Sequence, residues 1–209
     1  MSKKGIVITL EGSEGCGKST QVKLLHRYFK KKGYSVFLTR EPGGTRIGDG
    51  IRALLLDNKN HRLCALSEVF LYMASRAQIV DEVIFPKLKK GNIVLCDRWL
   101  DATVAYQGYG LGVDKNWIYQ PGKTATQGVE AKLTLFLDLP LKCGLERVKK
   151  RRSLDRIENK GLAFHKRVYR GYKEMAKQSP QRFKVVKIDP QDSPARVHEK
   201  IIEMVRHVL

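Results

Sequence analysis

Residues 12–19 carry the clearest chemical signal in this chain. They read Gly-Ser-Glu-Gly-Cys-Gly-Lys-Ser, a complete G-x-x-x-x-G-K-[ST] phosphate-binding loop between an apolar run and a helical pattern. The glycines let backbone N–H groups turn toward phosphate oxygens, Lys18 offers positive charge, and the Ser19 hydroxyl can ligate Mg²⁺. Because the glycines do not run G-x-G-x-x-G, the loop predicts binding of a nucleoside triphosphate and not of a dinucleotide. The predicted phosphate-binding residues are Gly12, Ser13, Glu14, Gly15, Cys16, Gly17, Lys18, Ser19 and Thr20.

Polar residues also follow two other apolar runs. One run leads into TREPGGT, residues 39–45, and another, residues 92–97, ends in Asp97 and is followed by Arg98. An apolar run that ends in Asp is typical of the strand that holds Mg²⁺ in phosphate-loop enzymes, so Ser19 and Asp97 are the predicted metal ligands. Arg98 can bind a phosphate through two parallel hydrogen bonds. The alternative is a structural ion pair between Asp97 and Arg98 at the end of the strand.

The apolar patterning places these motifs at the ends of strands in a parallel sheet. Short apolar runs predict strands at residues 5–11, 34–39, 92–97, 132–138 and 183–189. Helical spacing predicts helices at residues 18–32, 66–85 and 158–178, and a last helix that starts at Ser193 and Pro194. Strands that alternate with helices indicate an α/β fold, a five-stranded parallel sheet with helices on both faces and ligands at the carboxyl ends of the strands. We expect one domain over residues 1–209.

The helix predicted over residues 66–85 carries two sets of side chains. Its apolar residues at helical spacing are Leu66, Val69, Phe70, Met73, Ala77 and Val80. Tyr72 and Arg76 are four residues apart, so they share a face that is offset from the apolar stripe. This face is a candidate binding surface, although core packing of Tyr72 is the alternative.

The composition excludes several classes of protein. With 209 residues and 42% hydrophobic residues the chain can form one core, and no apolar run approaches the length of a membrane span. The four cysteines are far apart and predict reduced thiols, and no signal peptide is apparent, so we expect a cytoplasmic protein. A net charge of +19 admits a nucleic-acid-binding protein. The basic residues are dispersed and not interleaved with aromatic ones, which favours an enzyme with polyanionic substrates and no specific nucleic-acid site.

Four further segments occur in a fixed order after the phosphate loop. They are TREPGGTRIGDGIR, MASRAQ, DRWLDATVAYQG and SLDRIE. Together they resemble thymidylate kinase of the bacterial type, from Ile6 to about Val197. The resemblance implies transfer of the γ-phosphate of MgATP to dTMP, a fold of the phosphate-loop nucleoside monophosphate kinases, and a homodimer. The alternatives are a kinase for another monophosphate, such as dUMP or dCMP, and a nucleic-acid-stimulated NTPase.

The resemblance also implies an acceptor site for dTMP. Arg98 would bind the dTMP phosphate, Arg76 would reach the thymine edge, and Tyr72 would stack on the base. Tyr106 would exclude a 2′-hydroxyl, and Glu14 would accept the 3′-hydroxyl of the sugar. The other residues that the resemblance places at this site are Arg40, Pro42, Thr103 and Gln107.

A short lid is expected at about residues 147–160. The resemblance implies that Arg151 or Arg152 assists Lys18 and Arg98 in catalysis, because Gly15 leaves the phosphate loop without the arginine of eukaryotic relatives. A run of Lys and Arg is otherwise most often a solvated surface, so the inference rests on its position before SLDRIE. Next in order as candidates are Arg147 and Arg156.

The chain departs from the family pattern at three places. Ala102 occupies a position where Ser is frequent, and Thr103 follows it. Ser75 precedes Arg76 where the family commonly has Asp, and residues 131–132 are Ala-Lys in place of Pro-Asp. None of these changes removes a phosphate-binding group, so they bear on base preference more than on the type of reaction.

Overall fold

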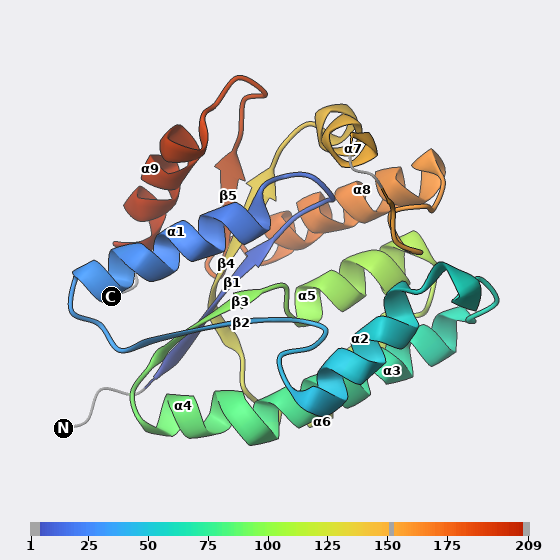
Figure 1. Ribbon diagram of the computed structural model, residues 1–209, viewed down its shortest axis with the longest axis horizontal. Helices are drawn as coiled ribbons and strands as arrows, with labels where there is room; N and C mark the ends of the chain where they lie inside the picture. The colour runs from blue at the N-terminus through green and yellow to red at the C-terminus, as the bar shows by residue number, and fades with distance from the viewer. Residues whose placement is uncertain (1–4, 151–152, 207–209) are drawn as a thin grey trace.

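A computed structural model describes residues 5–150 and 153–206, and these residues form a parallel sheet flanked by helices (Figure 1). Within them, five strands pair in the order β2-β3-β1-β4-β5. The strands are β1 (Ile6–Glu11), β2 (Val36–Arg40), β3 (Ile93–Asp97), β4 (Ala131–Asp138) and β5 (Phe183–Lys187). All four strand pairings are parallel, which confirms the predicted fold class.

The helices alternate with the strands along the chain. The α-helices are α1 (Lys18–Lys31), α2 (Arg46–Leu56), α3 (Ala65–Ile79), α4 (Phe85–Lys89), α5 (Leu100–Thr103), α6 (Asn116–Ala125), α7 (Leu141–Lys149), α8 (Leu162–Gln178) and α9 (Pro194–Val205). A 3₁₀ turn, η1 (Asn58–Asn60), and two π-helical segments, η2 (Val80–Ile84) and η3 (Val104–Gly110), complete the described elements.

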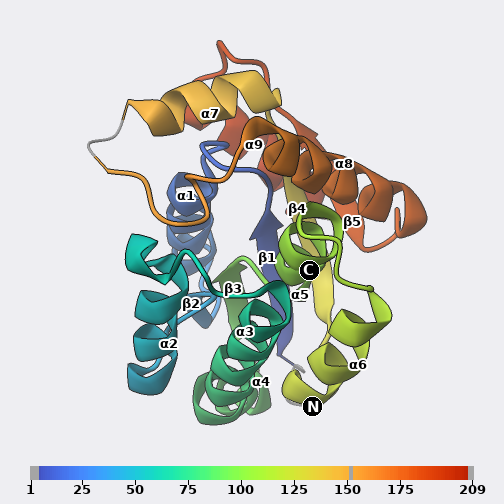
Figure 2. The ribbon, with the colours of Figure 1, turned by 90° about the vertical axis from the view of Figure 1, so that its right-hand side faces the viewer.

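Helices cover both faces of the sheet (Figures 1 and 2). Side chains along a strand alternate between the faces, so Ile8 and Leu10 of β1 pack in one core cluster with residues of α1 and α9. Val7 lies in a different cluster, with Ile79 and Val80 at the end of α3. Aromatic residues of β4, β5 and α8 form a third cluster. The buried faces explain why the strands read as nearly continuous apolar runs.

Local signals set the starts of the helices that flank the site. Gly17 precedes α1 with a φ of 95°, a left-handed conformation that glycine adopts without steric cost. The Thr45 hydroxyl accepts the N–H of Gly48 and caps α2, and the Ser193 hydroxyl accepts the N–H of Arg196 and caps α9. These caps fix where the chain leaves the carboxyl end of a strand and enters a helix.

The helix predicted over residues 66–85 differs from the structure in length and in burial. Helical geometry continues to Lys89, with the π-helical segment η2 just before Pro86, which cannot donate a backbone hydrogen bond to an α-helix. Val69 and Met73 are buried as predicted, but Leu66 and Phe70 are exposed. The apolar face of this helix is therefore wider than the part of it that packs against the core.

The part of the chain that the structure describes contains no helix with both the length and the apolar character of a membrane span.

Candidate active site

A cavity of about 390 Å³ lies at the carboxyl ends of the strands, beside the phosphate loop. The predicted site residues that line it are Glu14, Gly15, Gly17, Lys18, Ser19, Thr20, Arg40, Pro42, Tyr72, Arg76, Asp97, Arg98, Thr103, Tyr106 and Gln107. Gly12, Ser13 and Cys16 are buried and do not line it. The fold thus gathers residues from four separate segments around one space, although they are far apart in the sequence.

The phosphate loop curls around the Lys18 ammonium. Lys18 Nζ donates to the carbonyl oxygens of Gly12 and Ser13, at 3.0 Å and 2.9 Å. The loop also packs closely on α7, since a Cβ added to Gly15 would clash with the carbonyl oxygen of Gly144. An arginine at position 15 would therefore require α7 to move away, which agrees with the absence of an arginine from this loop.

Ser19 and Asp97 meet at one end of the loop. The Ser19 hydroxyl donates to Asp97 Oδ2 at 2.6 Å, so the two predicted metal ligands lie side by side. Hard oxygen ligands of this kind suit Mg²⁺, which usually keeps several waters and binds proteins through one or two side chains and substrate phosphates. The donor set therefore fits the predicted ion.

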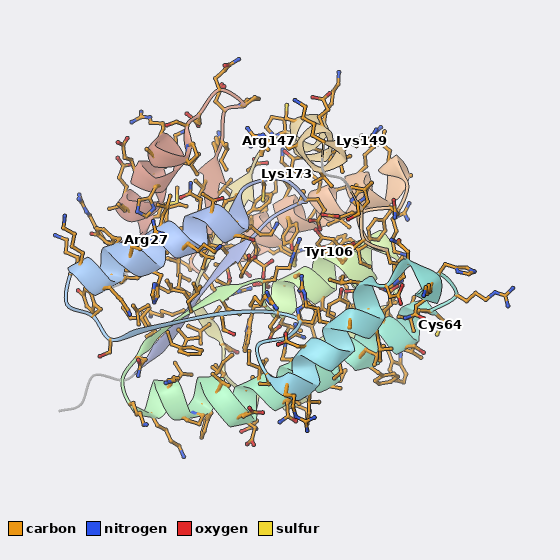
Figure 3. All side chains as sticks on the ribbon, in the orientation of Figure 1. Arg27, Cys64, Tyr106, Arg147, Lys149 and Lys173 are labelled. Atoms are coloured by element: carbon orange, nitrogen blue, oxygen red, sulfur yellow. The ribbon has the colours of Figure 1, made fainter. Side chains whose placement is uncertain are left out.

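Arg98 lies at the centre of a charged network inside the cavity. Its Nη2 donates to Glu14 Oε1 at 2.8 Å and to the Tyr106 hydroxyl at 3.0 Å, and Tyr106 donates to the same Glu14 oxygen at 2.6 Å. Tyr106 is buried, and Figure 3 labels it. This arrangement groups the three residues that were assigned to the acceptor's phosphate and sugar.

The charge of Glu14 is fixed by its neighbours. Burial alone would raise the pKa of Glu14, but the positive charges of Arg98 and Lys18 outweigh it and lower this pKa to about 2. Glu14 is therefore an ionised acceptor of hydrogen bonds at neutral pH. A sugar hydroxyl is a suitable donor for such a group.

Arg76 is held by a partner that the sequence did not reveal. Its Nε and Nη2 donate to Glu41 Oε2 at 2.8 Å and 2.6 Å, and Nη2 also donates to the Thr103 hydroxyl at 3.1 Å. Both Arg76 and Glu41 are almost fully buried. Thr103 therefore offers a hydroxyl to Arg76. Thr103 directly follows Ala102, the position at which serine is frequent in the family pattern.

Tyr72 lines the cavity near Arg76. Burial and the nearby charge of Glu68 raise the pKa of Tyr72 to about 12, so its ring stays neutral. Base stacking by Tyr72 stays a prediction.

The lid segment is anchored by a buried ion pair. Arg156 Nη1 lies 2.5 Å from Glu68 Oε1, and Arg156 Nε donates to the Leu55 carbonyl oxygen at 2.8 Å. Glu68 Oε2 accepts from Gln107 Nε2 at 3.0 Å. Arg156 is thus bound to α2 and α3 and is not available to a phosphate. Its spacing of 88 residues from Glu68 explains why the pair could not be read from the sequence.

The predicted lid arginines are placed differently. Arg151 and Arg152 lie outside the described residues. Arg147 of α7 lines the cavity and donates to the Pro190 carbonyl oxygen at 3.2 Å; Figure 3 marks it on that helix. Within the part of the chain that the structure describes, Arg147 is therefore an arginine of the expected lid region, residues 147–160, that lines the cavity.

Two further residues support the cavity and had no assigned role. Arg52 of α2 lines it and donates to the Pro42 carbonyl oxygen at 3.1 Å. The Ser75 hydroxyl accepts the N–H of Gly43 at 3.0 Å, so it steadies the loop after β2. Arg52 ends the segment TREPGGTRIGDGIR and Ser75 lies in MASRAQ, two of the segments that carry the family resemblance. Their place in these segments is the signal that could have predicted a role at the cavity.

The geometry defines a class of protein. A phosphate loop follows the first strand of a parallel sheet, and an arginine-centred pocket faces it across the same cavity. A donor triphosphate and a second phosphorylated substrate can then meet there, as in the phosphate-loop nucleoside monophosphate kinases.

Comparisons with known proteins identify the family within this class. The family model described as Thymidylate kinase matches residues 10–201. A thymidylate kinase of Exiguobacterium sp. is 46% identical over 199 residues, which cover 95% of this chain and 93% of that relative. One from Synechococcus sp. is 47% identical over 198 residues, with the same coverage. The crystal structure of thymidylate kinase from Ehrlichia chaffeensis matches with a TM-score of 0.77 at 33% identity, over 97% of this chain and 98% of that one. The chain belongs to the thymidylate kinase family.

Proposed function

We propose that this protein transfers the γ-phosphate of ATP to dTMP and so forms dTDP and ADP. The observation that carries the proposal is the shared cavity, in which the phosphate loop faces Arg98, Tyr106 and Arg76. Membership of the thymidylate kinase family supports it. Neither a nucleic-acid-stimulated NTPase nor a kinase for another monophosphate is favoured by these observations.

On the donor side, residues 12–20 bind the triphosphate. Backbone N–H groups and the start of α1 favour the phosphate oxygens, and Lys18 neutralises charge that grows in the transition state. Ser19 and Asp97 would hold Mg²⁺ together with the nucleotide. When bound, the ion neutralises charge on the β- and γ-phosphates.

On the acceptor side, Arg98 binds the phosphate of dTMP and Glu14 accepts the 3′-hydroxyl. Tyr106 crowds the 2′ position, while Tyr72 and Arg76 take the base. The remaining acceptor-site residues in this proposal are Arg40, Pro42, Thr103 and Gln107. No strong base is needed, because a phosphate monoester is mostly dianionic at neutral pH. Positioning and charge neutralisation therefore account for most of the catalysis.

The lid supplies the remaining positive charge in this proposal, through Arg151 or Arg152. Such an arginine contributes roughly 10³–10⁵ in kcat. Changing both residues to alanine should lower kcat by about that factor and leave dTMP binding, measured by calorimetry without ATP, nearly unchanged. If the double variant keeps more than about a tenth of kcat, Arg147 at the cavity wall becomes the candidate.

A coupled assay of ADP release tests the proposed activity. ADP should appear at a high rate with dTMP, and more slowly with dUMP, because one methyl group in an apolar pocket is worth roughly 10–200-fold. AMP and UMP should be poor acceptors. Preference for AMP or UMP, or ADP release that DNA stimulates without any monophosphate, would contradict the proposal.

We also propose that the protein is a cytoplasmic homodimer. Six of the seven large apolar side chains that are exposed among the described residues lie on three helices that pack side by side, α2, α3 and α6. They are Ile47, Leu54, Leu66, Phe70, Trp117 and Tyr119. An exposed group of this kind favours burial against another protein surface, and a second copy of the chain carries the same group.

A further inference from the structure

Arg98 has a backbone conformation that needs support. Its φ is 75°, in the left-handed region, which is unfavourable for a residue with a Cβ and a long side chain. Such strain persists only when surrounding contacts fix the conformation. The contacts that fix Arg98 therefore bear on how its guanidinium is aimed.

Glu11 makes a contact to the backbone just after Arg98. It ends β1, is fully buried, and its Oε1 accepts the N–H of Trp99 at 2.7 Å. This N–H belongs to the peptide that joins Arg98 to Trp99, so its direction depends on the conformation of Arg98. The hydrogen bond therefore holds the main chain of Arg98.

The other oxygen of Glu11 reaches the guanidinium through Tyr172. Tyr172 of α8 donates its hydroxyl hydrogen to Glu11 Oε2 at 2.8 Å, and that hydroxyl oxygen lies 3.4 Å from Arg98 Nη1. The Tyr172 ring is fully buried and stacks on Phe136, with ring centroids 5.3 Å apart. A ring packed in this way is a rigid support for its hydroxyl group.

We propose that Glu11 and Tyr172 are positioning residues that aim the Arg98 guanidinium at the phosphate of the acceptor nucleotide. Glu11 holds the main chain, and Tyr172 adds a rigid contact at Nη1 to those that the guanidinium makes with Glu14 and Tyr106. One buried pair therefore contacts both ends of Arg98. The inference rests on the proposed function, in which Arg98 binds that phosphate. Neither residue lines the cavity, so both act through Arg98.

The variant Tyr172→Phe tests this role, with Tyr169→Phe as its matched control. Tyr169 lies on the same helix and donates its hydroxyl to Asp138 at 2.6 Å, away from Arg98. Loss of a hydrogen bond to a charged group should lower kcat/KM for dTMP by roughly 10–100-fold in Tyr172→Phe. The KM for ATP and the activity of Tyr169→Phe should change by less than about twofold.

A double-mutant cycle with Arg98→Ala separates positioning from a general structural role. If Tyr172 acts through Arg98, adding Tyr172→Phe to Arg98→Ala should lower kcat/KM by less than about twofold further. A merely structural role would give the same loss in both backgrounds and would overturn the inference. These measurements are made at high enzyme concentration, so that the weak activity of Arg98→Ala can be followed.

Crystal structures of the wild type and of Tyr172→Phe test the positioning role without an activity measurement. The guanidinium of Arg98 should turn away from Glu14 and Tyr106 in the variant. Unchanged hydrogen bonds to those two residues would overturn the inference. A wild-type protein that is inactive on dTMP would instead contradict the proposed function, and the structures would still decide whether Tyr172 aims Arg98.

Discussion

At the scale of single residues, the cavity is lined by charge pairs that include proposed substrate-binding residues. Arg98 pairs with Glu14 of the phosphate loop at 2.8 Å, and the Tyr106 hydroxyl donates to the same carboxylate. Paired charges tolerate partial burial far better than single ones. The acceptor site can therefore be preorganised, with its charged groups already oriented.

Replacing Lys18 by alanine should abolish transfer and leave the fold intact. Among the described residues, the ammonium donates to two carbonyl groups of its own loop and to a cysteine sulfur, so its loss should remove the proposed transition-state charge without opening the core. Turnover should fall by at least about 10²–10³, the effect of removing one stabilising donor. The exposed Lys23 of α1 gives the matched control, Lys23→Ala. Near-normal turnover of Lys18→Ala, with an unchanged circular dichroism spectrum, would contradict the assignment of the phosphate loop.

Glu14 should make the stability of the protein depend on acid pH. Its folded-state pKa of about 2 lies below the usual 4.5, so the folded protein binds fewer protons than the unfolded chain between these values. The stabilisation is therefore present above about pH 4.5 and is lost as pH falls toward 2.

Urea unfolding of the wild type and of Glu14→Gln at about pH 7 and about pH 3.5 measures this effect. The wild type should lose more of its free energy of unfolding than the variant as the pH falls. An equal loss in both proteins would show that Glu14 has an ordinary pKa.

Residues of the site differ in how far the sequence could predict them. The phosphate loop is a contiguous motif whose spacing alone predicts the role of Lys18. Glu41 and Glu68 were not assigned roles, because their partners Arg76 and Arg156 lie 35 and 88 residues away and the contact exists only after folding. Periodicity reports which face a residue occupies and gives no information on its partner in another element.

At the scale of elements, α2, α3 and the lid segment meet around one buried ion pair. Arg156 joins the lid segment to the Leu55 carbonyl at the end of α2 and to Glu68 on α3. Breaking such a pair by removing one partner is costly, because the other charge remains buried.

The variant Arg156→Met should therefore lower the free energy of unfolding by about 3–5 kcal/mol. Adding Glu68→Gln should restore part of this loss, since Lys160, at 3.9 Å, would be the only cation left to pair with Glu68 among the described residues, and the buried carboxylate would be poorly compensated. The exposed pair of Arg170 and Glu174 provides the control, and Arg170→Met should cost less than about 0.5 kcal/mol. Urea unfolding measures all of these variants. A loss in Arg156→Met as small as that in the control would mean that the lid segment is not anchored there.

Elements could be predicted where periodicity and turn signals agree. All five predicted strands overlap the observed ones, because each is a short apolar run that ends at turn or charged residues. Only the three central strands, β1, β3 and β4, are mostly buried among the five described strands. The prediction of a helix over residues 66–85 was less accurate. The helical segment passes through the π-helical segment η2 and continues beyond Pro86 to Lys89, and Phe70 is exposed. Apolar residues at helical spacing identify an apolar face of a helix, but they do not show which other element covers that face.

At the scale of the whole molecule, the exposed apolar residues of α2, α3 and α6 stand out against a strongly basic chain. The net charge of +19 keeps separate molecules apart by repulsion. Association then requires an apolar surface that outweighs this repulsion, and the proposed dimer would use the exposed residues of these three helices.

Phe70→Glu should convert the proposed dimer to a monomer, because it places a charge in the middle of the apolar group. Light scattering after gel filtration should give twice 23.8 kDa for the wild type and 23.8 kDa for the variant. The control is Arg27→Glu on α1, which lies on the other face of the sheet. This variant should have the same mass in solution as the wild type. A wild-type mass of 23.8 kDa would contradict the dimer.

The fate of the γ-phosphate tests the central claim most directly. The protein is incubated with ATP labelled at the γ-phosphate, with Mg²⁺ and dTMP, and the products are separated by chromatography. The account predicts that the label appears in dTDP, one for each ADP formed, and that little label is released without dTMP. Label that appears as inorganic phosphate at a rate independent of dTMP would contradict it.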